Sequence, residues 1–344
     1  MTTQPGEGTH RRVIRSLPDA DVLEEPCGES NGLRRIIVNA KTPSLFVARR
    51  EVVTSYPEDL IVFILGIKGP GYLCDEIARD EDPSYVEASL KQDILSFVPA
   101  QDFYGKRVLD FGCGAGASTM ILARMLKGAD IYGVELSPRL LSIAKARAAH
   151  YGSDPERLLL SPDGNTLPGN LKTFDAVILS AVWEHLLPTE RPAVMKQIWS
   201  VLRPGGYLFI NQTPNRYSPI DSHTTGLPFI NYLPDRAAHA AAVHFSKRIE
   251  PGTSWETLLR NGIRGGTTRE VLDTIRHACL GAATPMKPIA SSGARDVIDL
   301  WYETSASARL PVLKRAVWAF LKLVKVVTGA EIAPELTLAI RKDP

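Results

Sequence analysis

Short apolar runs alternate with amphipathic segments along the middle of the chain. Five of these runs have the length of buried strands: RVLDF (107–111), IYGVE (131–135), RLLLS (157–161), FDAVILS (174–180) and YLFIN (207–211). The segments between them are predicted to be helices, at about 117–126, 138–151 and 189–202. Parallel strands need a crossover that returns over the sheet. The pattern therefore predicts a parallel sheet with helices on both faces, over residues 101–212.

The N-terminal extension, residues 1–100, has a less regular pattern. About the first thirty residues are rich in charge, proline and glycine, so this part is expected to be loose. The apolar run LIVFILGI (60–67) fits either a strand or a buried helix. Apolar residues one helical turn apart predict a helix over 84–97, so the extension is expected to be partly disordered and then helical.

The regular alternation also ends after residue 211. A loop with four prolines (212–234) precedes helical patterns at about 235–248, 254–261, 268–280 and 294–306, and a cationic, apolar stretch at 311–328. Long loops in compact domains are usually functional, so residues 213–335 are predicted to be a mainly helical lid or substrate insertion. The strand-like LTLAI (336–340) within 336–344 is expected to rejoin the sheet.

Composition and charge exclude several protein classes. The chain has 344 residues, 40 basic and 38 acidic, and its formal net charge of +2 offers no general attraction for nucleic acid. Its four cysteines lie far apart, which indicates reduced thiols in a cytosolic protein and predicts neither a disulfide framework nor a zinc site. No stretch reaches the about 18 apolar residues of a membrane span. The expected location is therefore the cytoplasm.

A glycine-rich turn is the sharpest chemical signal. In VLDFGCGAGAST (108–119), Gly112, Gly114 and Gly116 follow a buried strand and precede a helix, where a ligand can approach the backbone at a helix N-terminus. The spacing is G-x-G-x-G and not the dinucleotide-binding G-x-G-x-x-G. Asp110 ends the strand, and Glu135 ends the next one, where a carboxylate can accept both ribose hydroxyls.

Residues 105–212 resemble the class I S-adenosylmethionine-dependent methyltransferases. The resemblance rests on the glycine turn, GVELSP (133–138), FDAVILSAVWEHLL (174–187) and LRPGGYLFI (202–210), in this order. It implies a doubly wound, mainly parallel seven-stranded sheet with an antiparallel last strand, and S-adenosylmethionine as cofactor. By position it places Asp110, Gly112 and Gly114 at the methionine part, Glu135 at the ribose, and Asp163 with Gly164 at the adenine amine. The other cofactor contacts that it implies are Cys113, Gly116, Leu136 and Ser180.

Candidate catalytic residues follow the fourth predicted strand. Glu184 and His185 lie at its carboxyl end, where open parallel sheets have their ligand crevice, and His223 lies in the loop after the fifth strand. The alternative is that these residues have only a structural role, in local capping or packing. Some family members that methylate hydroxyls bind a divalent metal through E-x-x-E-H and a later histidine, but here Ala181 takes the place of the first glutamate. No metal is therefore predicted.

The stretch 310–329 allows two interpretations. Its lysines and arginine share one narrow helical face beside a wide apolar one, and no acid occurs between Thr304 and Ala330. Such a helix can lie in a membrane interface, which would make the protein peripheral at the inner face of the membrane. The simpler interpretation is a helix buried against the rest of the protein.

Three functions remain open on these grounds. The favoured one is S-adenosylmethionine-dependent methylation of an oxygen on a small molecule, sugar or glycan-lipid. A nicotinamide-dependent oxidoreductase is the second. It is less favoured, because the glycine spacing is not that of a dinucleotide-binding turn and the WEHL segment (183–186) has no role in such an enzyme. A non-catalytic binding or scaffold protein is the third. Nucleic acid is not an expected partner, because no Asn/Asp-Pro-Pro-aromatic motif follows the fourth strand.

Overall fold

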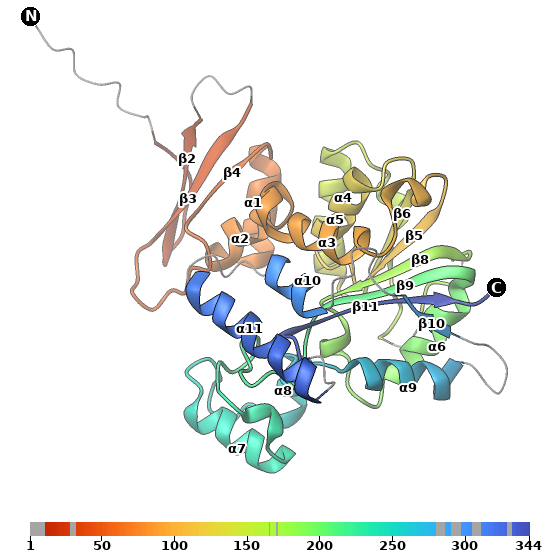
Figure 1. The fold of residues 1–344 in the computed structure, drawn as a ribbon. Helices are drawn as coiled ribbons and strands as arrows, with labels where there is room; N and C mark the ends of the chain where they lie inside the picture. The colour runs from red at the N-terminus through yellow and green to blue at the C-terminus, as the bar shows by residue number, and fades with distance from the viewer. Residues whose placement is uncertain are drawn as a thin grey trace, which may run out of the picture.

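The computed structural model describes residues 11–27, 32–164, 166–169, 171–279, 286–289, 297–304, 311–328 and 332–344. A central α/β unit occupies the middle of the chain, and a small N-terminal sheet with its own helices lies at one side of it (Figure 1). Helices of the 213–335 segment lie along another side.

The central sheet has seven strands in the order β10-β11-β9-β8-β5-β6-β7. They are β5 (Arg107–Phe111), β6 (Asp130–Glu135), β7 (Leu158–Leu160), β8 (Phe174–Ser180), β9 (Leu202–Pro214), β10 (Met286–Pro288) and β11 (Glu335–Lys342). Strands β5 to β9 pair in parallel, whereas β11 runs antiparallel to β9 and β10 antiparallel to β11. The predicted seven-stranded, mainly parallel sheet with an antiparallel last strand is confirmed. Edge strand β10 was not predicted, because three residues are too few to form a pattern.

Helices cover both faces of this sheet. On one face, α3 (Ala88–Leu95) and α4 (Ala117–Met125) pack against Val108 and Ile178. On the other, α6 (Arg191–Val201) and α9 (Thr268–Cys279) pack against Val177 and Leu208. Neighbouring residues of β8 serve opposite faces because side chains alternate along a strand. The short helical turns are η1 (Pro83–Glu87), η2 (Ala100–Phe103), η3 (Pro155–Arg157) and η4 (Trp183–His185), and α5 (Pro138–His150) follows β6.

The N-terminal extension is more ordered than its composition suggests. It forms an antiparallel sheet of β1 (Arg12–Ser16), β2 (Ala20–Pro26), β3 (Arg34–Ala40) and β4 (Glu51–Thr54), followed by α1 (Glu58–Lys68) and α2 (Pro70–Glu81). The expectation of a loose segment is therefore wrong over residues 12–26. Val22, Ile36 and Val38 bury one face of the sheet against the two helices, while charged residues take the other face. The apolar run at 60–67 is the core of α1.

The insertion before the last strand is mainly helical, as predicted. Its helical elements are η5 (Ile230–Tyr232), α7 (Asp235–Phe245), α8 (Trp255–Arg260), α9, α10 (Val297–Thr304) and α11 (Pro311–Thr328). Ile230, Ala238 and Leu258 form a small separate core under α7 and α8. None of the described helices combines the length and apolar character needed to cross a bilayer.

Candidate functional site

The glycine turn between β5 and α4 requires glycine for two different reasons. Gly112, Gly114 and Gly116 all have positive φ, at 73°, 56° and 86°, a region that other residues rarely adopt. A Cβ on Gly116 would lie 2.7 Å from the Cβ of Ala144, so α5 can approach the turn only because this side chain is absent. A Cβ on Gly114 would meet no atom within 4 Å. The turn is therefore closely packed on one side and open on the other.

Glu135 at the end of β6 is directed at this turn. Its carboxylate accepts hydrogen bonds from the backbone N–H of Gly114 at 2.8 Å and from that of Ser137 at 2.7 Å. Carboxylates that accept backbone N–H groups make strong, charge-assisted bonds. Glu135 therefore lies against the glycine turn, as the sequence predicts, and its carboxylate is held in a fixed position at the sheet edge.

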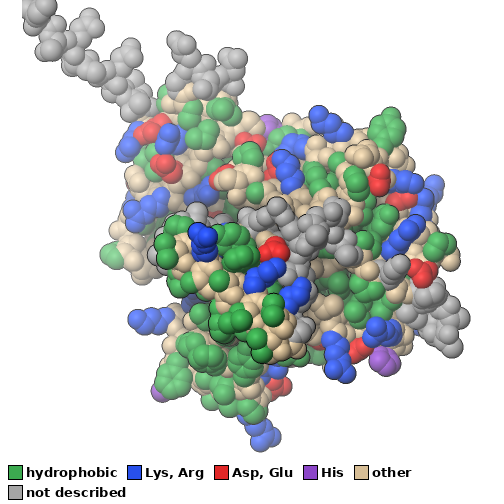
Figure 2. Space-filling model, in the orientation of Figure 1, with side chains coloured by type: hydrophobic (Ala, Val, Ile, Leu, Met, Phe, Trp, Pro, Cys, Tyr) green, Lys and Arg blue, Asp and Glu red, His purple; other side chains and the backbone are tan. Residues whose placement is uncertain are grey.

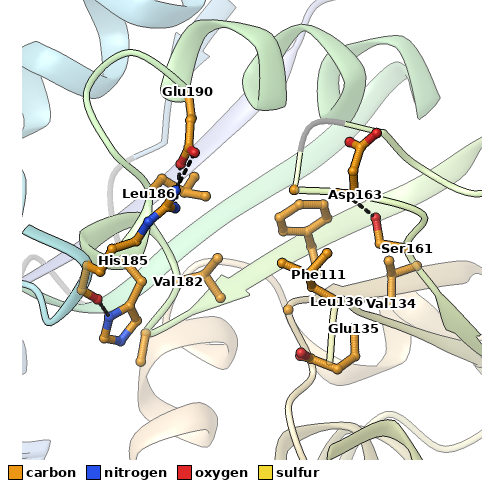
Figure 3. Close-up of a pocket in the computed structure, with 14 residues that line it drawn as sticks. Phe111, Val134, Glu135, Leu136, Ser161, Asp163, Val182, His185, Leu186 and Glu190 are labelled. Carbon is orange, nitrogen blue, oxygen red and sulfur yellow. Dashed lines mark hydrogen bonds and ion pairs between the residues drawn. The ribbon is translucent and has the colours of Figure 1, made fainter. Parts of the chain in front are cut away.

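A cavity of about 340 Å³ opens at the carboxyl ends of β5, β6 and β8. Glu135 and Asp163 lie on one side of it, and His185 and Glu190 on the other (Figure 3). Its volume is within the range of small-ligand sites. The predicted cofactor residues that line it are Gly112, Glu135, Leu136, Asp163 and Gly164.

The remaining predicted cofactor residues lie beside or beneath the cavity. Asp110 is buried and accepts hydrogen bonds from Ser118 at 2.7 Å and Thr119 at 2.6 Å, and burial raises the pKa of this carboxyl to about 6. Burial also raises the pKa of the Cys113 thiol, which packs into the core under the turn. The Ser180 hydroxyl at the end of β8 is buried and has no hydrogen-bond partner among the described residues. Gly114 and Gly116 are not among the cavity-lining residues.

The three candidate catalytic residues lie together, and one of them, His185, lines the cavity. Glu184 is 1% exposed; its Oε2 accepts a hydrogen bond from Thr213 at 2.9 Å, and its Oε1 lies 3.8 Å from His185 Nε2. The ring of His223 is 5.7 Å from that of His185, between centroids. Burial raises the pKa of Glu184, although the nearby His185 opposes the shift. Loss of hydration, and then His185, lower the pKa of His223.

Hydrogen bonds fix which nitrogen of each imidazole carries the proton. His185 Nδ1 lies 2.6 Å from the backbone oxygen of Arg260, which can only accept, so Nδ1 donates and the neutral ring has its lone pair on Nε2. His223 Nδ1 lies 3.2 Å from Thr224 Oγ1, whose own proton goes to the backbone oxygen of Asn261 at 2.7 Å. In both neutral rings Nε2 is therefore left as a proton acceptor.

This arrangement depends on residues that sequence reasoning did not find. Arg260 in α8 makes two bonds to Glu190, at 2.5 and 2.6 Å, and both residues line the cavity. Gly262 (φ 89°) allows the loop after α8 to approach His223, because a Cβ on this residue would lie 3.0 Å from the His223 ring. No local signal marks these residues, since they meet the candidate catalytic residues only through the folded insertion.

Comparison with known proteins finds a likeness to methyltransferases. Residues 108–206 match a family model described as a methyltransferase domain. The chain is 29% identical over 150 residues to the ubiquinone biosynthesis O-methyltransferase of Xanthomonas axonopodis pv. citri, covering 43% of this chain and 58% of that protein. It is 30% identical over 107 residues to the carboxy-S-adenosyl-L-methionine synthase of Aliivibrio salmonicida, covering 30% and 43%.

A solved structure of CalS10 with bound S-adenosylmethionine, an amino pentose methyltransferase from Micromonospora echinaspora, is 28% identical. That match covers 37% of this chain and 50% of CalS10, with a TM-score of 0.29. The chain spans between 58% and 62% of the length of the first matching O-methyltransferases. The residues that the family model matches, 108–206, include the glycine turn, Glu135 and the Glu184-His185 pair. Over residues 108–206 the chain therefore matches a methyltransferase domain and is similar to S-adenosylmethionine-dependent methyltransferases.

Proposed function

We propose that the protein transfers a methyl group from S-adenosylmethionine to an oxygen of a small molecule, sugar or glycan-lipid. The observation that supports this most is the Glu135 carboxylate fixed against an open glycine turn, on a cavity that His185 also lines. The residues present fit the cofactor. Glu135 would hold the ribose hydroxyls, Gly112 and Gly114 would accommodate the methionine part, and Asp163 would lie near the adenine.

The cofactor supplies an electrophilic methyl group on a sulfonium, and the chain has to align the nucleophile with it and receive a proton. Alignment in a closed site is worth up to about 7–11 kcal/mol, by analogy with intramolecular reactions. His185 Nε2 is the proton acceptor in this proposal, because its lone pair is free and its ring is oriented through Arg260. Glu184 and His223 would stabilise the imidazolium that forms. Residues 213–335 would close over the acceptor as a lid.

A divalent cation is the second possible role for this cluster. The ligand atoms of Glu184, His185 and His223 all lie within 4.8 Å of one another, and Glu184 Oε1 has no hydrogen-bond partner among the described residues. Two imidazoles and a carboxylate are a common metal-binding set. In the E-x-x-E-H pattern the first glutamate would supply a further carboxylate, but Ala181 occupies its position here.

Chelation separates the two roles. If His185 acts as a proton acceptor alone, a large excess of EDTA is expected to leave the rate of methyl transfer unchanged, within about twofold. Loss of activity on chelation, restored by magnesium or zinc, would instead assign the cluster to a cation.

Two experiments test the proposed reaction. Isotope-labelled methyl transfer from S-adenosylmethionine into a cell extract is expected to depend on the purified protein. Mass spectrometry of metabolites and glycolipids, from cells with and without the protein, is expected to show an acceptor and a product that differ by one CH₂ unit. If no label is transferred while the protein binds S-adenosylmethionine, the non-catalytic alternative replaces the enzyme.

We further propose that helix α11 attaches the protein to the inner face of a membrane. Its cationic side faces the protein: Lys322 pairs with Asp299 at 2.8 Å, Trp318 donates to the same carboxylate, and Lys314 lies over the ring of Tyr302.

Among the residues of α11, only Leu321 is buried. The opposite side is apolar and open: Val312, Leu313, Phe320, Leu323, Val326 and Val327 are 57–82% exposed. Figure 2 shows hydrophobic side chains gathered over α11 and over α7.

An anionic bilayer fits this face better than a second copy of the chain. The helix carries four cations and no acid, and one of them, Arg315, is exposed, so a symmetric pair would bring like charges together, whereas a lipid phosphate would pair with Arg315. Leu323→Asp is expected to lower flotation with phosphatidylserine-containing liposomes at least fivefold, because it places a charge in the apolar face. Val13→Asp, at an exposed site of β1, is the control and is expected to float like the wild type. Equal flotation of both variants would contradict the membrane contact.

A further inference from the structure

One buried guanidinium supports the glycine turn from beneath. Arg147 of α5 is fully buried, and its Nη1 donates a hydrogen bond to the backbone oxygen of Ala115 at 2.8 Å. Ala115 lies between Gly114 and Gly116 in the turn. The N–H of the same peptide group, that of Gly116, donates to the Cys113 oxygen at 2.9 Å. The peptide that closes the turn is therefore held at both its N–H and its C=O.

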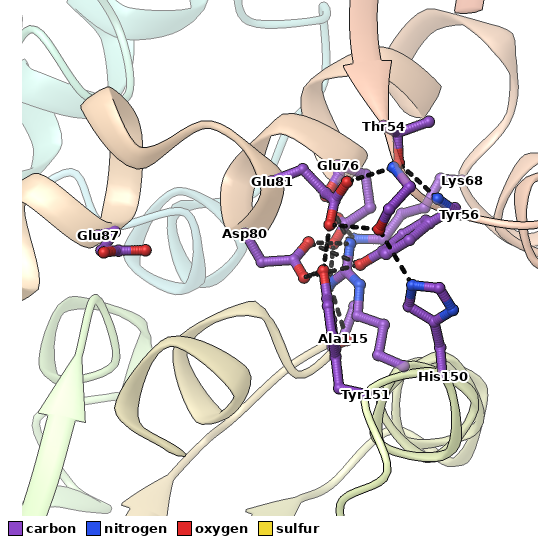
Figure 4. A network of polar contacts seen from close by, with 12 residues as sticks. Thr54, Tyr56, Lys68, Glu76, Asp80, Glu81, Glu87, Ala115, His150 and Tyr151 are labelled. Carbon is purple, nitrogen blue, oxygen red and sulfur yellow. Dashed lines mark hydrogen bonds and ion pairs between the residues drawn. The ribbon is translucent and has the colours of Figure 1, made fainter. Parts of the chain in front are cut away.

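The other bonds of Arg147 reach the N-terminal unit. Its guanidinium pairs with Glu76 at 3.0 Å and Asp80 at 3.6 Å, and donates to the backbone oxygen of Glu76 at 2.5 Å. Figure 4 shows Glu76 and Asp80, both on α2, within this network of polar contacts. Glu76 is also paired with Lys68 at 2.7 Å. Asp80 accepts hydrogen bonds from Tyr56 at 2.7 Å and from Tyr151. Arg147 thus links a buried acidic pair of α2 to the turn that borders the cavity.

The role that best explains this network is to fix the position of the glycine turn, and not to stabilise the fold. A buried ion pair is often no more stabilising than well-packed apolar side chains of the same volume, because both charges lose their hydration. An apolar side chain at position 147, however, could not hold the Ala115 carbonyl in place. A lysine could reach the carbonyl or the carboxylates, but it lacks the rigid fork that contacts them together.

We propose that Arg147 is a positioning residue for S-adenosylmethionine, and that α2 of the N-terminal unit is thereby part of the cofactor site. The proposal rests on the proposed function, because it takes the glycine turn as the cofactor-binding element. Arg147 does not line the cavity. It acts on the cofactor only through the peptide between Ala115 and Gly116.

The test compares Arg147→Lys with Arg124→Lys by calorimetric titration with S-adenosylmethionine. Arg124 of α4 also donates to α2, at the Asp80 oxygen and 2.6 Å, but has no bond to the turn. We expect Arg147→Lys to raise Kd about tenfold, or about 1.4 kcal/mol, and Arg124→Lys to leave it unchanged. In turnover assays, Arg147→Lys is expected to raise KM for S-adenosylmethionine with little change in kcat. A merely structural defect would lower kcat and leave KM unchanged.

Three other outcomes are also decisive. If Arg147→Lys folds and binds as tightly as the wild type, the positioning role is wrong, while the proposed function stands. If the wild type itself does not bind, the proposed function fails first. If Arg147→Lys does not fold, Glu76→Gln carries the test, because it keeps the shape of the side chain and weakens the hold on Arg147. It is expected to raise Kd about threefold, and an unchanged Kd would overturn the inference.

Discussion

Glu135→Gln is expected to weaken the binding of S-adenosylmethionine by about 10- to 150-fold. Hydrogen bonds to charged groups contribute about 1.5–3 kcal/mol, and the substitution removes the charge that would hold the ribose hydroxyls. It also replaces one acceptor oxygen by an NH₂ group, which cannot accept from the N–H of Gly114 or Ser137. Isothermal titration calorimetry measures the effect.

The matched control is Glu156→Gln, which removes an equal charge from a side chain that is 84% exposed. Its affinity for S-adenosylmethionine is expected to equal that of the wild type. If Glu135→Gln also binds like the wild type, Glu135 does not hold the cofactor.

His185→Asn is expected to lower kcat by about 10²- to 10⁴-fold, the usual contribution of a positioned general base. Asparagine can still donate to the Arg260 oxygen, but it offers no basic nitrogen. The affinity for S-adenosylmethionine is expected to change by less than about threefold, since His185 lies across the cavity from Glu135.

His277→Asn is the control for this prediction. His277 in α9 makes the same kind of bond, from Nδ1 to the backbone oxygen of Asp273 at 2.7 Å, but it does not line the cavity. Its kcat is expected to be unchanged. If His185→Asn keeps the kcat of the wild type, His185 has no role in the reaction.

The central sheet could be predicted because its signal is local. Parallel strands buried on both faces are continuous apolar runs, and FDAVILS is the clearest example. The N-terminal sheet escaped prediction because its buried residues alternate with charged ones, so that its composition resembles that of a loose segment. Strand β10 is too short to carry any pattern.

The candidate site likewise has one part that could be predicted from the sequence and one part that could not. Glu135 and the glycine turn are defined by one strand-turn-helix-strand segment, so their approach follows from chain order. Arg147 resembles an ordinary cation of an amphipathic helix, and it meets Glu76 and Asp80 of α2 only because the chain folds them together. Glu190 and Arg260 are 70 residues apart in the chain, and their pairing depends on how the insertion folds back. Contacts of this kind have no signature in a single sequence.

Titration of the full chain with S-adenosylmethionine, and in parallel with NAD, shows which cofactor the glycine turn and Glu135 bind. We expect saturable binding of one S-adenosylmethionine per chain and no measurable binding of NAD. Binding of NAD with no heat from S-adenosylmethionine would contradict this expectation.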